Sequence, residues 1–284
     1  MSDDFLQGTL GKTGRGVFRL GLAASYLPGQ RAVERALDEG VNYVFCYGFD
    51  FQMIRVLRRL TPERRDRVVI ATGAYNWMLW RQNLERTLEK RLRQLRTDRI
   101  DVFHFLGVMR PKDLTPRVRD QLERLRHDPR VGAVSMSCHD RKLAGRLAAE
   151  GAVDCLMIRY NAAHRGAETE IFPLLERHDP GLVSYTATRW TGLVRRTRGW
   201  PKGGPIPTAG QCYRFVLSHP HVDVCLTAPS SERQLVENLE AVRRGPLPED
   251  EMAFMRTYGD QLHRNAGWFM EPKRDREAKP GRAA

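Results

Sequence analysis

The stretch VGAVSMSCHDRKLAGRLAAEGAVDCLMIRY, residues 131–160, decides the fold of this chain. Residues 131–138 form a short run of apolar and small side chains, and residues 153–160 form a second one. Between them, Leu143, Leu147 and Ala148 recur at helical spacing after Asp140. Two apolar runs joined by a helical pattern are typical of a parallel β-α-β unit.

The same alternation continues in both directions along the chain. The chain contains eight apolar runs in all, at residues 17–22, 41–47, 68–73, 100–106, 131–138, 153–160, 181–188 and 222–228. Eight strand-helix units in 284 residues predict one closed α/β barrel, a single (β/α)8 TIM barrel. In such a barrel the chemistry lies at the C-terminal ends of the strands, which limits the search for functional residues.

The two ends of the chain add elements to the barrel. Residues 10–22, LGKTGRGVFRLGL, place a Gly-Lys-Thr-Gly turn between short apolar runs, which predicts an N-terminal hairpin before the first barrel strand. Residues 248–262 predict an extra C-terminal helix that begins with a proline. We assign residues 1–268 to the barrel domain and residues 269–284 to a disordered basic tail. Residues 190–207 predict a long loop after the seventh strand, a type of loop that is usually functional or mobile.

Composition favours a protein that binds neither nucleic acid nor a membrane. The net charge of +13 comes mostly from arginines spread over the predicted helices, whereas a nucleic-acid-binding protein would concentrate its charge on one element. No apolar stretch approaches the roughly 18 residues that span a membrane, so we expect no membrane association and a cytoplasmic location. The five cysteines form no CxxC pair, which favours buried thiols in a reducing compartment over a metal site. The oligomeric state stays open.

The order of landmarks resembles the aldo-keto reductase family from residue 10 to about residue 247. The matching segments are LGKTG (10–14), GVNYVFCYG (40–48), RVVIATG (67–73), TDRIDVFHFLG (97–107), VSMSCHD (134–140), IRYNAAHRGAETEIFP (158–173), LVSYTATRWTGLV (182–194) and PSSERQLVENLEAV (229–242). The resemblance implies reduction of a carbonyl by hydride from NADPH. It also implies a tyrosine proton donor, a lysine and an aspartate that tune this tyrosine, and a histidine that orients the substrate.

Three of these four catalytic positions carry other residues. The aspartate position falls on Phe45, the lysine position on Gly73 and the histidine position on Leu106. Tyr47 is the candidate for the tyrosine, provided that the loop after the second strand is shorter than in the family. His104 lies two residues before Leu106 and therefore on the same face of its strand, where it could substitute for the missing histidine. The alternatives are that Tyr47 only lines the barrel mouth and that His104 is a core residue.

The resemblance also implies a set of cofactor-binding residues. Tyr185 corresponds to the aromatic residue that stacks on nicotinamide, and Ser135 to the serine that binds its carboxamide. A structural role at a strand end is the alternative for Tyr185. The loop after the seventh strand brings cations toward a pyrophosphate, and the helix after Ser230 could present free N–H groups to an anion. The full set is Ser135, Tyr185, Arg189, Ser230, Arg233, Glu237 and Asn238.

Two questions stay open at this level. Ser231 stands where the family usually has an arginine near the adenosine 2′-phosphate, so Arg233 would have to reach back, and both NADP(H) and NAD(H) remain candidate cofactors. The chain is either a divergent oxidoreductase with a carbonyl or alcohol substrate, or a nucleotide- or ligand-binding barrel without catalysis. A basic protein that associates with nucleic acid is a third reading. Other polar or aromatic residues at the strand ends could line the pocket: Tyr75, Asn76, Ser137, His139, Arg159 and Asn161.

Overall fold

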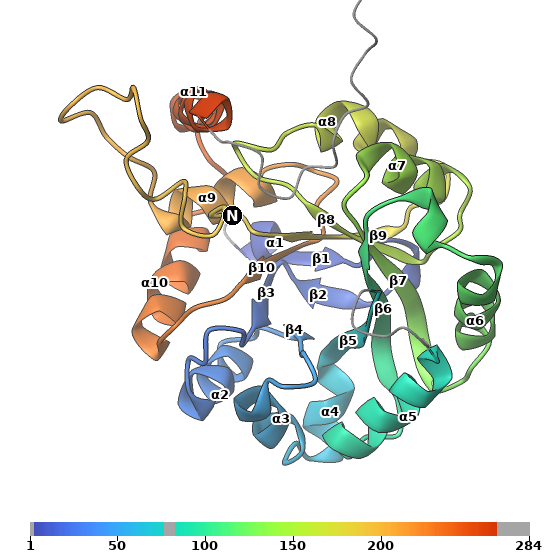
Figure 1. Cartoon of the computed structure of the whole chain (residues 1–284). Coiled ribbons are helices and arrows are strands. Elements are labelled where there is room, and N and C mark those ends of the chain that lie inside the picture. Colours follow the sequence, from blue (N-terminus) through green and yellow to red (C-terminus); the bar gives the residue numbers. More distant parts are fainter. Residues whose placement is uncertain (1–2, 77–82, 266–284) are drawn as a thin grey trace, which may run out of the picture.

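The computed structural model describes residues 3–76 and 83–265 and confirms the barrel. Eight parallel strands close in the order β10-β3-β4-β5-β6-β7-β8-β9, with helices around them (Figure 1). The barrel strands are β3 (Leu20–Ala23), β4 (Tyr43–Phe45), β5 (Val69–Tyr75), β6 (Ile100–Val108), β7 (Val131–Cys138), β8 (Cys155–Arg159), β9 (Gly181–Tyr185) and β10 (Val224–Thr227).

The helices follow the strands along the chain. They are α1 (Asp3–Leu6), α2 (Gln30–Asp38), α3 (Phe51–Leu57), α4 (Pro62–Arg67), α5 (Leu84–Leu95), α6 (Pro116–Arg126), α7 (Arg141–Ala149), α8 (Ala167–Glu170), α9 (Ala209–Leu217), α10 (Glu232–Val242) and α11 (Glu249–Asn265). Short 3-10 turns lie at η1 (Gly11–Thr13), η2 (Pro111–Asp113) and η3 (Phe172–Leu174). Between β8 and β9 the short α8 and η3 take the place of a full helix.

Most element boundaries agree with the sequence pattern, and one does not. The extra C-terminal helix is α11, which begins directly after Pro248. The N-terminal hairpin consists of β1 (Gln7–Thr9) paired antiparallel with β2 (Gly16–Phe18). The prediction of one strand over residues 17–22 was wrong at its start, because Val17 and Phe18 belong to the hairpin and the barrel strand begins at Leu20. The predicted tail, residues 269–284, lies outside the described residues, and the domain boundary stays a prediction.

Two apolar layers hold the barrel together. Leucine, valine and alanine side chains from the outer faces of the strands pack against the helices. The interior is filled by a second cluster that includes Tyr43, Phe45 and Leu106, and Leu10 and Val17 from the hairpin region belong to the same cluster. The hairpin therefore closes the N-terminal end of the barrel, and the opposite end forms the mouth (Figure 1).

A repeated polar contact ties the strands together in pairs at the N-terminal end. Beside the start of every second strand, a side-chain oxygen accepts the backbone N–H of a residue in or just before the preceding barrel strand. The contacts are Phe18 N to Asn42 (2.7 Å), Ile70 N to Asp101 (2.9 Å), Val134 N to Asp154 (2.9 Å) and Leu182 N to Asp223 (2.8 Å). Each contact satisfies a backbone N–H donor in the N-terminal part of the barrel.

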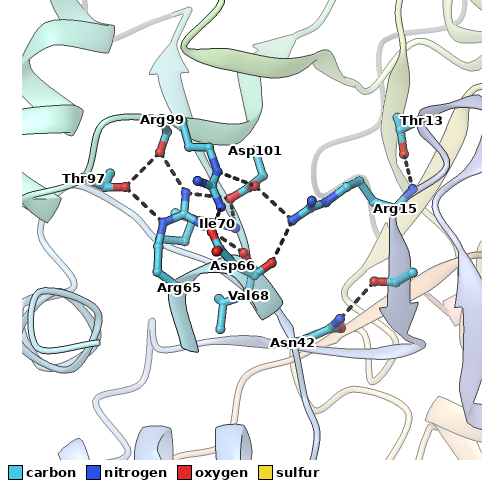
Figure 2. Close-up of polar contacts among 11 residues, drawn as sticks. Thr13, Arg15, Asn42, Arg65, Asp66, Val68, Ile70, Thr97, Arg99 and Asp101 are labelled. Atoms are coloured by element: carbon cyan, nitrogen blue, oxygen red, sulfur yellow. Dashed lines mark hydrogen bonds and ion pairs between the residues drawn. The ribbon is translucent and has the colours of Figure 1, made fainter. Parts of the chain in front are cut away.

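Asp101 makes the most extensive of these contacts (Figure 2). Its Oδ2 atom lies 2.8 Å from the Arg65 guanidinium, and its Oδ1 atom lies 3.3 Å from that of Arg15 and 3.8 Å from that of Arg99. Arg65 is itself buried and donates to the carbonyl oxygens of Val68 and Arg99. Since Asp101 and Arg65 are both buried, removing either side chain would leave the charge of the other buried without a partner and would destabilise the fold.

The described part of the chain also bears on the membrane and cysteine predictions. None of its helices combines the length and the apolar character that a membrane-spanning helix requires. All five cysteines are buried free thiols, as the sequence predicted.

Candidate functional site

An aromatic wall lies at the mouth of the barrel around Tyr47. The Tyr47 ring stacks on Phe49 at 5.3 Å and on Tyr75 at 5.6 Å between ring centroids. Its edge contacts Phe45, with the two centroids 4.6 Å apart. Phe49 is 57% exposed, so one side of this stack faces solvent. The structure thus places Tyr47 at the mouth, where the sequence pattern expected it.

Apolar side chains or none stand at the three positions where the sequence pattern predicted an aspartate, a lysine and a histidine to be replaced. Phe45 and Leu106 are buried in the interior cluster. At Gly73 even a methyl group has no room, because an ideal Cβ atom there would lie 1.8 Å from the backbone oxygen of His104 on the neighbouring strand. The backbone itself therefore excludes a lysine at position 73.

The electrostatic surroundings of Tyr47 keep its phenol protonated. Burial raises the pKa of Tyr47 to about 12, and the nearby Asp50 and Tyr26 add to the increase. Asp50 is buried and accepts the backbone N–H of Tyr47 at 2.8 Å. Burial also raises the pKa of this carboxyl group, to about 6.

His104 lies below the mouth, inside the barrel. It is fully buried, and its Nε2 atom lies 3.1 Å from the Tyr43 hydroxyl group. Burial lowers the pKa of His104 to about 3, so the ring is neutral. These contacts match the core-residue alternative for His104, and a catalytic role for it stays a prediction.

The other side of the mouth carries polar groups from β7, β8 and β9. The Tyr185 hydroxyl group lies 3.3 Å from Nδ1 of His139, and Arg159 is in register with Tyr185 on the adjacent strand. Burial raises the pKa of Tyr185, while Arg159 and Ser137 partly offset that increase. Burial and the charge of Arg159 together lower the pKa of His139 to about 4.

The segment after β9 has an unusual backbone. Thr186, Arg189, Trp190 and Thr191 all have positive φ angles, between 50° and 68°. Such angles are uncommon for residues other than glycine and tend to occur at functional sites. Asn161 supports the segment, because its side chain donates to the Thr186 carbonyl oxygen at 2.9 Å.

The rest of the long loop leaves the mouth and runs beside α11 (Figure 1). The Tyr258 hydroxyl group of α11 accepts the Thr197 N–H and donates to the Arg195 carbonyl oxygen. The Arg196 guanidinium donates to the carbonyl oxygens of Pro201 and Gly204, within the loop itself. Of the loop arginines, Arg189 is the one that lies next to β9 and carries the partly buried, positive-φ backbone described above.

The remaining candidate cofactor residues lie around β7 and α10. Ser135 is fully buried on β7, in register with His104. At the start of α10, both the N–H and the hydroxyl group of Ser230 contact Oε1 of Gln234. Arg233 and Glu237 form an exposed ion pair of 3.6 Å on one face of that helix.

Asn238, by contrast, points inward. It is 7% exposed, and its side chain donates to the Thr227 hydroxyl group at 3.0 Å. The side chain of Asn238, a candidate adenine contact, thus forms a hydrogen bond between α10 and β10 in this structure.

Two observations fit a nicotinamide dinucleotide at this end of the barrel. The Ser135 hydroxyl group has no hydrogen-bond partner although it is buried, as is expected of a group that binds a ligand's carboxamide. The partly buried Tyr185 ring packs against the interior cluster and offers a flat surface at the mouth. Within residues 3–76 and 83–265, no cluster of three or more histidine, cysteine or acidic side chains could hold a metal ion.

Comparisons with known proteins agree with this architecture. The family model described as "Aldo/keto reductase family" matches residues 28–203. A solved aldo-keto reductase from Bacillus halodurans in its holo form is similar, with a TM-score of 0.72 and 20% identity over 93% of this chain and 98% of that one. An aldo/keto reductase from Klebsiella pneumoniae, in complex with NADP and acetate, has a TM-score of 0.70 and 19% identity over 94% and 96%. The search of curated proteins returned no match.

Proposed function

The chain belongs to the aldo/keto reductase family, and from this premise we propose that it is an NAD(P)(H)-dependent oxidoreductase with a divergent site. The observation that supports this best is that Tyr47 and Tyr185 both lie at the mouth of the barrel. Tyr47 reaches it from β4 and Tyr185 from β9, close enough that a charge on Tyr47 would raise the pKa of Tyr185. These are the residues expected to donate a proton and to stack on nicotinamide. The substrate would be a carbonyl compound or the corresponding alcohol.

The cofactor would lie along the ends of β7, β9 and β10. Tyr185 would support the nicotinamide ring, and Ser135 and Arg189 would bind its polar groups. Ser230, the α10 N-terminus, Arg233, Glu237 and Asn238 would bind the adenosine half. When bound, the dinucleotide supplies or accepts a hydride. NADP in the Klebsiella pneumoniae relative supports NADP(H) here. NAD(H) is the alternative, because Arg233, which would have to bind the 2′-phosphate of NADP(H), is exposed and paired with Glu237.

Tyr47 would act as the proton donor. With a pKa of about 12 its phenol is protonated at neutral pH and can donate to a developing alkoxide. A phenol of that pKa is a weak acid, and Phe45, Gly73 and Leu106 provide no neighbouring cation to strengthen it. We therefore expect slow reduction, and still slower oxidation of the alcohol, because oxidation requires the phenolate.

Calorimetry with NADPH and NADH tests the cofactor, and a panel of carbonyl compounds tests the reaction. We expect one dinucleotide to bind and Tyr47→Phe to abolish the turnover of NADPH without weakening its binding. Tyr26→Phe is the matched control, since it removes an exposed phenol at the same mouth. If neither dinucleotide binds, the proposed function is wrong; if Tyr47→Phe retains activity, Tyr47 is not the donor.

The Gly73 backbone contact favours a second candidate function, a nucleotide- or ligand-binding barrel without reductase chemistry. A lysine at that position is sterically excluded by the neighbouring backbone, so a single substitution of Gly73 could not provide a lysine there. Binding of a dinucleotide without turnover of any compound in the panel would support this candidate over the first.

The partner and location proposals follow from composition and burial. The five buried thiols support a cytoplasmic location. We propose small-molecule partners and no nucleic acid; a nucleic-acid complex that weakens steeply with salt would contradict this.

A further inference from the structure

Arg159 lies inside the mouth of the barrel, not on its outer surface. On β8 the side chains of Cys155 and Met157 belong to the interior cluster, and strand alternation places Arg159 on the same face one step nearer the mouth. Arg159 is partly buried, and its guanidinium carbon lies 5.9 Å from the centre of the Trp190 ring. Arg159 is in register with Tyr185, which packs against the same interior cluster, so the two side chains lie next to each other on the inner face of the barrel.

Cations gather on this side of the mouth. His164 is buried, and Arg159, Arg189, His263 and Arg141 all act with burial to lower its pKa to about 3. Arg159 has the same effect on His139. Both imidazoles are therefore neutral at physiological pH and can donate or accept hydrogen bonds. Arg141 is paired with Glu170 at 3.1 Å, so the cations whose charge reaches these two imidazoles from the inner side of the mouth are Arg159 and Arg189.

The opposite side of the mouth is aromatic. Tyr47 stacks between Phe49 and Tyr75, and Tyr26 is 55% exposed and close enough to influence the pKa of Tyr47. These side chains come from the loops after β3 and β4 and from the end of β5, whereas Arg159 ends β8, Arg141 begins α7 after β7, and Arg189 follows β9. The mouth thus has one aromatic wall and one cationic wall.

We propose that this mouth selects a ligand in which a carboxylate lies next to an apolar or aromatic group, with Arg159 as the specificity-determining residue. The proposal rests on the proposed function, because it names the substrate class of the same site. A planar guanidinium matches a carboxylate through two parallel hydrogen bonds, and the aromatic wall provides flat apolar area for the rest of the ligand. Phosphate groups of the dinucleotide share the anionic chemistry, so the experiment must separate the two sources.

Three probes separate charge from ring: 3-phenylpropanoate, its neutral amide 3-phenylpropanamide, and propanoate. Calorimetry on the full chain, with and without NADPH, should show that 3-phenylpropanoate binds at least tenfold more tightly than either of the others. Arg159→Gln should remove roughly ten- to hundredfold of that affinity and leave the amide unaffected, since a charge-assisted hydrogen bond contributes about 1.5–3 kcal/mol. Phe49→Ala should weaken 3-phenylpropanoate but not propanoate.

Matched controls make the result decisive. Arg146→Gln removes an exposed arginine on α7 and should change none of the affinities. Arg159→Lys keeps the charge without the planar fork and should show intermediate binding. Thermal melting of each variant checks that the fold is intact.

The proposal is overturned if folded Arg159→Gln still prefers the carboxylate over the amide, or if wild-type protein shows no such preference. It is also overturned if Arg159→Gln weakens NADPH and not 3-phenylpropanoate, since Arg159 would then bind a cofactor phosphate. Failure of the proposed function is a separate result, namely that wild-type protein binds neither NADPH nor NADH.

Discussion

Replacing Gly73 by alanine tests whether the backbone, and not only the choice of side chain, has removed the lysine position. The added Cβ atom would lie 1.8 Å from the His104 oxygen, 2.7 Å from its carbonyl carbon and 2.8 Å from its nitrogen. Real Cβ atoms essentially never come within 3.0 Å of such atoms, so β5 and β6 would have to separate by more than about 1 Å. The shift would occur where Gly73 and His104 are paired in the barrel.

The expected cost follows from what this separation disrupts. Overpacking of a filled interior costs about 1–3 kcal/mol, and each strained or lost ladder hydrogen bond adds about 0.5–1.5 kcal/mol. The His104–Tyr43 hydrogen bond lies at the same level of the barrel and would be strained as well. We therefore expect Gly73→Ala to lower the free energy of unfolding by about 2–4 kcal/mol.

Urea unfolding followed by circular dichroism measures this change. Gly16→Ala is the matched control, because a Cβ atom at Gly16 meets no atom within 4 Å and should change stability by less than about 0.5 kcal/mol. A Gly73→Ala variant as stable as wild type would refute the steric reasoning. So would a Gly73→Lys variant that folds normally and gains reductase activity.

Three further predictions concern protonation and ion pairs. Because the pKa of Tyr47 is about 12 and that of the neighbouring Asp50 is about 6, kcat/KM for carbonyl reduction should stay constant between about pH 7 and 9 in a pH-rate profile. Asp101→Ala should cost about 3–5 kcal/mol in urea unfolding because it leaves Arg65 buried without its carboxylate, whereas Asp66→Ala, at an exposed residue, should cost less than about 1 kcal/mol. Burial raises the pKa of Asp223 to about 7 from 3.8, so the native state holds this proton longer than the unfolded chain does. Stability should therefore fall as the pH rises from about 4 to 7, and Asp223→Asn should flatten that decrease in unfolding curves measured across this range.

The barrel could be predicted from the sequence because its signal is local and repeated. The apolar spacing after Asp140 predicted α7, and the Asp140 side chain accepts the Leu143 N–H at the start of that helix. The first strand was misplaced for a non-local reason. Arg19 interrupts the apolar run, and its guanidinium donates to the carbonyl oxygens of Leu217 and Val222, almost 200 residues later in the chain.

The candidate site was predictable only in part. Landmark order was sufficient to predict that Tyr47 and Tyr185 lie at the mouth, and it predicts that Phe45, Gly73 and Leu106 stand where the family has ionisable groups. It was not sufficient to show that position 73 has no room for a side chain, because that clash depends on how closely β5 and β6 approach each other. Alternation along β8 could have indicated that Arg159 faces inward, but not which charges surround it.

The mouth carries charged groups although Gly73 stands where the resemblance predicts a lysine. Burial raises the pKa of the Tyr185 phenol and Arg159 offsets part of that increase, whereas burial, Asp50 and Tyr26 all raise the pKa of Tyr47. Positive charge thus lies beside β8 and β9, across the barrel from the residue expected to donate a proton. Charge in that position can do little to activate Tyr47, but it can hold an anionic group of a ligand beside the Tyr185 ring. The electrostatics of this mouth therefore favour the selection of a ligand more than the acceleration of a proton transfer, which is why ligand charge is the property to vary first.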